Sequence, residues 1–202
     1  MGKRSSARQR LMIAQKAAEL IVKEGVADYH LAKRKACERL GLPVKTDMPR
    51  NQEVEKAVME HQRLFAGDQH SIELAELRGA ALEIMRILKG FEPRLVGSVL
   101  KGTANALSTV HLHVFSDDAK SVAIAMLNVG LNFQPIDRRL HKDNPKGVPG
   151  FLLDWKGVAI EMLVFPYDGL RNPPPSPVDG KPMKRARIAE VEALLEVAPA
   201  VL

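Results

Sequence analysis

The feature that most constrains the fold is the stretch from residue 94 to residue 115, where two short apolar segments flank a glycine-containing turn. The first segment reads RLVGSV and the second, residues 109–115, reads TVHLHVF, with Gly97 and Gly102 between their apolar parts. The second segment alternates, so an extended chain would carry one apolar face, made of Val110, Leu112 and Val114. We therefore expect two neighbouring β-strands, joined through a glycine turn and a short helix, with one face of the second strand in a core.

Apolar residues at helical spacing predict helices before this stretch, and alternating apolar residues predict further strands after it. Gly67 to His70 has the composition of a short hinge between the last two of these early helices. The expected early helices cover residues 7–23, 29–40, 52–65 and 72–89, and the last three would be capped by Asp28, Asn51 and Ser71. The expected later elements are a helix at 119–129, strands at 133–140, 150–155 and 158–165, and a last helix at 188–197. Lys156 and Gly157 would form the tight turn of a hairpin between the last two strands.

These elements predict an α+β protein in two parts. Residues 1–68 form a basic helical region with a possible helix-turn-helix. Residues 69–202 form a domain whose mixed, mainly antiparallel sheet is flanked by helices. A proline-rich loop and a short helix close this second domain.

Positive charge is concentrated near the N-terminus. The first 50 residues hold twelve Lys and Arg against five Asp and Glu, whereas the whole chain has a net charge of +6. A basic segment on a near-neutral body favours a polyanionic partner, above all nucleic acid, and its plainer interpretation is a solvated surface that aids solubility. The first ten residues lack the apolar stretch of a signal peptide, no apolar run is long enough for a membrane span, and Cys37 is the only cysteine. We expect a cytoplasmic protein without a membrane partner, a disulfide framework or a multi-cysteine zinc site.

The helix expected at residues 29–40 carries the clearest basic cluster. If this helix follows a turn in a helix-turn-helix, its basic side chains would contact nucleic acid. The alternative is an amphipathic helix with a solvated basic face. The residues concerned are Lys33, Arg34, Lys35 and Arg39.

The glycine turn has a spacing that can be compared with a known motif. Residues 97–112, GSVLKGTANALSTVHL, resemble the pattern G-S-x-A-R-G-x-A-x-x-x-S-D-x-D-L of the nucleotidyltransferase superfamily, which includes polymerase beta and the antitoxin-like nucleotidyltransferases. The resemblance covers about residues 74–166 and leaves the N-terminal helices outside it. It implies a nucleotidyltransferase-like fold and a phosphate-binding frame made of Gly97, Ser98, Lys101, Gly102 and Ser108.

The chain departs from this pattern where the family binds metal. Thr109 and His111 stand on the two aspartate positions, and Glu161 is the candidate for the third acid on a later strand. Two-metal phosphoryl transfer needs anionic oxygen ligands, because Mg²⁺ prefers oxygen. The resemblance therefore implies a catalytically degenerate member that binds a nucleotide or a nucleic acid as an adaptor or regulator. The side chains expected in its cleft are Thr109, His111, His113 and Glu161.

Three other interpretations of these residues stay open. The chain can be an active nucleotidyltransferase with an unusual metal site. His111, His113 and Glu161 can instead hold a divalent metal ion, such as Zn²⁺, Fe²⁺ or Mn²⁺, in a metal-dependent hydrolase, with His141 as a fourth group if its loop folds back. Finally, the two histidines can be partly buried polar side chains, or imidazole donors to a phosphate without metal.

Overall fold

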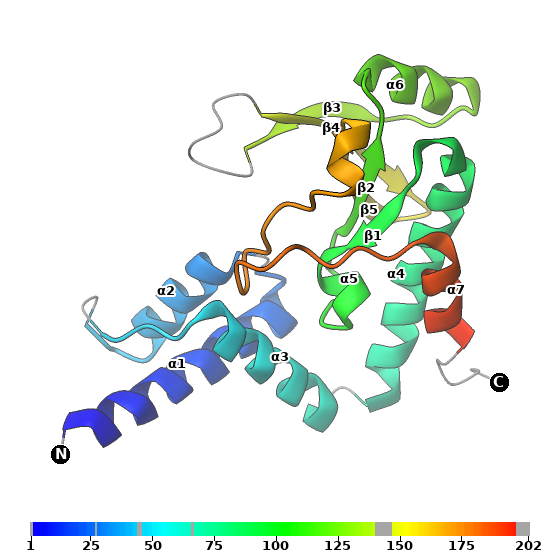
Figure 1. Ribbon diagram of the computed structural model, residues 1–202. Helices are drawn as coiled ribbons and strands as arrows, with labels where there is room; N and C mark the ends of the chain where they lie inside the picture. Colours follow the sequence, from blue (N-terminus) through cyan, green and yellow to red (C-terminus); the bar gives the residue numbers. More distant parts are fainter. Residues whose placement is uncertain (1, 27, 44–45, 66, 140–146, 197–202) are drawn as a thin grey trace.

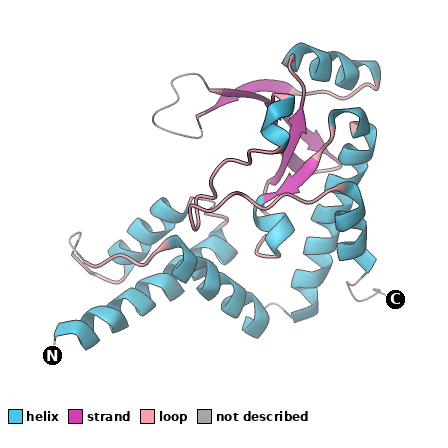
Figure 2. Ribbon diagram, in the orientation of Figure 1, coloured by secondary structure: helices cyan, strands magenta, loops and turns pink. Residues whose placement is uncertain are grey.

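The computed structural model describes residues 2–26, 28–43, 46–65, 67–139 and 147–196, and confirms the α+β class. In these ranges helices lie beside one open sheet, and the N-terminal helices form a separate group (Figures 1 and 2). The helices are α1 (Gly2–Glu24), α2 (Tyr29–Arg39), α3 (Asn51–Phe65), α4 (Gly67–Ile87), α5 (Gly97–Lys101), α6 (Ala119–Asn128) and α7 (Ile188–Glu196), with 3₁₀-helices η1 (Lys89–Phe91) and η2 (Tyr167–Leu170). The strands are β1 (Arg94–Val96), β2 (Val110–Phe115), β3 (Gln134–Arg138), β4 (Val148–Trp155) and β5 (Val158–Phe165).

The sheet is mixed and mainly antiparallel, as the sequence predicts. Its strand order is β1-β2-β5-β4-β3, and the one parallel pair among these strands is β2 with β5. The expected hairpin joins β4 to β5, and Lys156 and Gly157 both take positive φ in its turn. This topology brings β5, which is late in the sequence, directly beside β2.

One face of the sheet is packed against helices. Val110, Leu112 and Val114 of β2 are buried there, as the alternation predicts, together with alternate residues of β4 and β5. The helices contributing buried side chains to this core are α4, α5, α6 and α7. The opposite face therefore carries the remaining side chains of the same strands, and it is this face that concerns function.

Helices α1, α2 and α3 have a core of their own, and we call them the helical lobe; the rest of the described chain is the sheet lobe. The core of the helical lobe includes the buried side chains of Ile13, Leu20 and Val54. Asp28 caps α2 by accepting a hydrogen bond from the backbone N–H of Leu31. The separate cores explain why α1–α3 appear as a distinct group in Figure 1.

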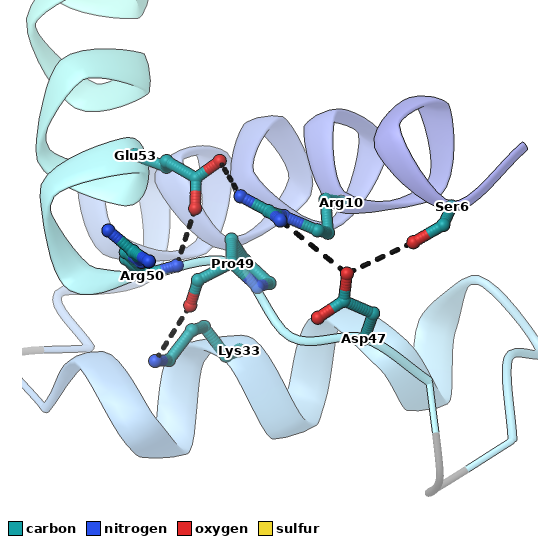
Figure 3. Close-up of polar contacts among 7 residues, drawn as sticks. All are labelled: Ser6, Arg10, Lys33, Asp47, Pro49, Arg50 and Glu53. Carbon is teal, nitrogen blue, oxygen red and sulfur yellow. Dashed lines mark hydrogen bonds and ion pairs between the residues drawn. The ribbon is translucent and has the colours of Figure 1, made fainter. Parts of the chain in front are cut away.

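The segment that leads into α3 is fixed to α1 and α2 by polar contacts (Figure 3). Arg10 of α1 reaches Asp47 at 3.5 Å and Glu53 at 2.7 Å. Lys33 of α2 donates to the carbonyl oxygen of Pro49 at 3.0 Å. Glu53 also accepts from the backbone N–H of Arg50, which closes the first turn of α3. The basic helix α2 is thus anchored partly through one of its lysines.

The proline-rich loop, residues 171–187, links the two lobes. It leaves η2, extends toward α3 and returns along the sheet to α7 (Figure 1). At its far end the carbonyl of Pro177 accepts a hydrogen bond from Asn51 of α3. On its return Ala186 pairs with Leu95 of β1, so the loop adds a short edge to the sheet.

The structure corrects two local expectations. The hinge expected at Gly67 to His70 is wrong, because these residues form the first turn of α4. The strand expected at residues 94–99 ends at Val96, since Gly97 takes φ +76° and starts α5. Among the described helices, none combines the length and the apolar character needed to cross a bilayer.

Candidate functional site

The polar half of the open sheet face is built from the paired strands β2 and β5. His111 lies directly opposite Glu161 in the parallel register, although 50 residues separate them in sequence. Val96 lies on the other side of His111, and the next residue, Gly97, makes the turn into α5. A Cβ at Gly97 would lie 3.4 Å from Cδ2 of His111, so the turn passes close over the imidazole. Two residues of the expected cleft and the expected glycine turn therefore meet at one place.

The carboxylate of Glu161 is held by Arg138 from β3. Arg138 donates to Oε2 from Nε at 2.9 Å and also from Nη2, while Nδ1 of His111 lies 3.7 Å from Oε1. The Glu161 side chain is only 9% exposed, whereas those of Arg138 and His111 are 57% and 42% exposed. His111 and Arg138 lower the pKa of Glu161 to about 2 against the opposing effect of burial, so the carboxyl is ionised at neutral pH.

Gly150 lies on β4 between the two ends of this contact. Arg138 is paired with Val148 of β4, and Glu161 is paired with Leu152, two residues either side of Gly150. A Cβ at Gly150 would come within 2.4 Å of the carbonyl oxygen of Met162. The glycine leaves β4 without a side chain at the point where the arginine reaches toward β5.

His113 does not join the polar half. It is 3% exposed, and its Nδ1 accepts a hydrogen bond from Nε of Arg185 at 3.1 Å. Its ring lies 4.5 Å from that of Phe165, and the Arg185 guanidinium lies over Phe115 and Phe165. Burial, and then the nearby Arg185 cation, lower the pKa of His113 to about 3. The other half of this face is thus an apolar cluster closed by the proline-rich loop.

A metal centre made of His111, His113 and Glu161 finds no support in this geometry. Within the described ranges, no group of three or more His, Cys, Asp and Glu side chains could hold a metal ion. Glu161 is engaged by a guanidinium, Nδ1 of His113 faces an arginine, and Thr109 is half-buried just before β2. These residues do not fit Mg²⁺ either, because a single carboxylate already neutralised by arginine is a poor ligand set for it. His141 lies outside the described residues.

The residues expected to bind phosphate divide into two groups. Gly97 and half-buried Ser98 start α5 beside His111. The other three make structural contacts: Lys101 and Ser108 take part in contacts between the lobes, and Gly102 contacts α4 within the sheet lobe. Lys101 pairs with Glu55 of α3 at 2.7 Å, and the carbonyl oxygen of Gly102 accepts a hydrogen bond from Nε2 of His70.

The loop between α5 and β2, residues 102–109, is the joint between the lobes. Ser108 closes a turn with Asn105, whose side chain donates to the last-turn carbonyls of α1 at Ile21 and Val22. Gln62 of α3 donates to two carbonyls of the same loop. Ser108, the serine that precedes the second strand, thus supports the contact of this loop with the helical lobe.

The basic residues of α2 also divide. Lys33 is tied to Pro49 and to Asn51, and Arg39 makes two hydrogen bonds to Glu24 at 2.6 and 3.1 Å. Arg34 is 62% exposed, with Glu38 at 4.0 Å, and Lys35 is half-buried. Within the described residues, Arg34 and Lys35 therefore make fewer polar contacts than Lys33 and Arg39 do.

The sequence patterns predict neither the place of Arg138 in the site nor the contact of Arg185 with His113. The alternation of QPIDR does put Gln134, Ile136 and Arg138 on one face of a strand. The local pattern does not determine the register of this strand in the sheet, which brings the Arg138 side chain within reach of Glu161.

No protein-family model, curated protein or solved structure matches this chain.

Proposed function

We propose that this chain is a nucleotidyltransferase-like protein without nucleotidyl transfer activity, which binds a phosphate group of a nucleotide or nucleic acid in a regulatory or adaptor role. The observation that carries the proposal is the register of His111 against Glu161 beside the Gly97 turn. In the resemblance, these positions correspond to the second and third acids of the family. Their pairing on adjacent strands supports the resemblance, because the motif alone does not determine that the two residues are neighbours in space.

A binding role is favoured over transfer by the chemistry of the site. Thr109 and His111 replace the two aspartates, and the remaining acid, Glu161, is paired with Arg138. To bind the Glu161 carboxylate, a divalent cation would have to displace the guanidinium of Arg138. The exposed Arg138 and His111 side chains offer N–H donors on the open face, which suit a phosphate oxygen.

The test is a fluorescence anisotropy titration with a labelled ATP analogue, a labelled single-stranded RNA and a labelled DNA duplex, at about 50 mM and about 200 mM salt. Saturable binding to at least one probe, weaker at the higher salt, is expected. Gly97→Ala should weaken it, because φ +76° strains any side chain and the new Cβ would contact His111. Gly41→Ala, also at positive φ but with open space around it, is the matched control. Absence of saturable binding to all three probes contradicts the proposal.

A further inference from the structure

The Arg138–Glu161 pair raises a question that the family motif does not answer. In a metal-dependent phosphate site, carboxylates hold cations, and the cations hold the phosphate. Here a nearly buried carboxylate holds a guanidinium whose side chain remains 57% exposed. In both arrangements a carboxylate lies next to the sheet and a positive charge lies outside it. In this chain the positive charge is the guanidinium of Arg138, whereas in a metal-dependent site it is the metal ion.

We propose that Arg138, oriented by Glu161 and flanked by His111, binds a phosphate group directly on the open half of the sheet, without a divalent cation. The inference rests on the proposed function and specifies how its site recognises the ligand. The ligand chemistry is a phosphate mono- or dianion with accessible oxygens, carried by a nucleotide or by a nucleic-acid strand.

The orientation of the guanidinium supports this assignment. Its Nε and Nη2 both point to Oε2 of Glu161, so two of its five N–H donors are used and the planar group is fixed. An arginine fixed in advance loses less conformational entropy on binding than a free surface arginine does. Among the contacts of the described residues, the other edge of the fork has no partner, and it matches two phosphate oxygens, a geometry that lysine cannot offer.

The surroundings fit an anion more closely than a cation. His111 borders the pair and is exposed enough to reach a ligand, and Gly97 leaves the imidazole without a neighbouring Cβ. Arg138 donates to Oε2 of Glu161, and Oε1 lies 3.7 Å from Nδ1 of His111. The pKa of Glu161 is lowered to about 2, first by His111 and then by Arg138, against the opposing effect of burial, so the pair keeps the carboxylate ionised beneath the exposed arginine. Packing does not explain why the Arg138 side chain remains 57% exposed, whereas binding of a ligand to its exposed side does.

The two residues of the pair should have opposite effects on binding. Arg138→Gln removes the cation and should weaken phosphate binding about tenfold or more, as expected for loss of a charge-assisted hydrogen bond. Glu161→Gln keeps an acceptor for Arg138 but removes the negative charge that competes with the phosphate, so affinity should rise about threefold. In a metal-dependent site, the same Glu161→Gln change would abolish binding, so the sign of its effect separates the two mechanisms.

The experiment measures the affinity of the full chain for a labelled ATP analogue and a labelled single-stranded RNA, each with EDTA or with Mg²⁺, and with inorganic phosphate as competitor. The variants are Arg138→Gln, Arg138→Lys and Glu161→Gln. The control is Arg86→Gln, because Arg86 is 58% exposed and pairs with Glu192 on the helical side of the sheet lobe. Its affinity should equal that of the wild type. Competition by phosphate against one probe and not the other identifies the source of the phosphate group.

The outcomes separate the mechanism from the function. Equal binding with EDTA and Mg²⁺, loss in Arg138→Gln and gain in Glu161→Gln support the inference. Binding that needs Mg²⁺ and is lost in Glu161→Gln, or binding unchanged in Arg138→Gln, overturns the inference but leaves the proposed function standing. No binding to either probe overturns the inference, and it overturns the proposed function too when the DNA duplex also fails to bind. If Arg138→Gln does not fold, as judged by circular dichroism, Glu161→Gln decides by the direction of its effect.

Discussion

Arg185 donates a hydrogen bond from Nε to Nδ1 of His113 over 3.1 Å, so this imidazole nitrogen must be unprotonated. Arg185 belongs to the proline-rich loop and His113 to β2, and the contact therefore closes the loop over the apolar half of the sheet. A protonated His113 would place two cations against each other in a buried position. The relationship makes His113 a structural residue of the folded state rather than a member of the polar site.

This contact predicts a dependence of stability on pH. The pKa of His113 falls from 6.5 to about 3 on folding, so between these values the unfolded chain binds a proton that the native chain does not. The contribution is present above pH 6.5 and is lost as pH falls toward 3. Urea unfolding from neutral pH down to pH about 4 should show a steeper loss for the wild type than for His113→Gln. His30→Gln, at an exposed position, should follow the wild-type slope; equal slopes for all three proteins would contradict the assignment.

The ion pair of Lys101 and Glu55 predicts an effect on the joint between the lobes. Both side chains are mostly buried and the Nζ–Oε1 distance is 2.7 Å, so removal of one partner leaves the other charge unpaired. Lys101→Met should lower the free energy of unfolding by about 1–3 kcal/mol, measured by urea titration. Lys16→Met, which removes an i,i+3 pair on α1, should cost less than about 1 kcal/mol. Unchanged stability with weakened phosphate binding would instead make Lys101 a ligand-binding residue.

Gly150 predicts a strict requirement for glycine on β4. Its Cβ would approach the carbonyl oxygen of Met162 to 2.4 Å, and backbone atoms cannot move aside as a flexible side chain can. Gly150→Ala should destabilise the protein by about 2–4 kcal/mol. Gly79→Ala, in the interior of α4 with open space at its Cβ, should instead stabilise it by about 0.5–1 kcal/mol. A thermal unfolding comparison of the two variants that shows equal shifts would rule out the close approach.

Helix α2 gives a prediction that separates packing from nucleic-acid contact. Lys33 holds the start of α3, so Lys33→Met should lower stability by about 1–2 kcal/mol. Arg34 and Lys35 have fewer contacts, so a double change to Glu should leave the unfolding curve near that of the wild type. If α2 contacts a nucleic acid, the double variant should also lower the salt dependence of binding by a slope of about 2. RNA and DNA titrations indistinguishable from wild type would leave α2 with a purely structural role.

The sequence predicted most of the fold because its local signals agree with one another. The β5 segment has the boundaries that its alternation predicts, α3 begins at Asn51, one residue before the predicted start, and the Lys156-Gly157 turn forms the predicted hairpin. The errors occurred where tertiary context decides. Gly67 to His70 have the composition of a hinge but are helical, and the strand predicted through residue 99 ends at Val96.

The candidate site was only partly predictable, because its geometry depends on register between strands far apart in sequence. Alternation put His111 and His113 on one face, and the structure agrees, but it also separates them into an open half and a half covered by Arg185. Arg138 could be recognised only once β3 was paired with β4 and β4 with β5. The interlobe contacts of Lys101 and Ser108 likewise depend on where the helical lobe packs, and no local pattern encodes that position.

The most direct measurement for the whole account is a calorimetric titration of ATP into the wild-type protein in the presence of EDTA. We expect saturable binding at one site, with a Kd that changes less than about threefold when Mg²⁺ replaces the chelator, because Arg138 supplies the positive charge. A Kd at least about tenfold weaker in EDTA would show that a metal ion carries the phosphate and would contradict the central claim. The absence of binding in both conditions, for ATP and likewise for the single-stranded RNA and the DNA duplex, would contradict the proposed function as well.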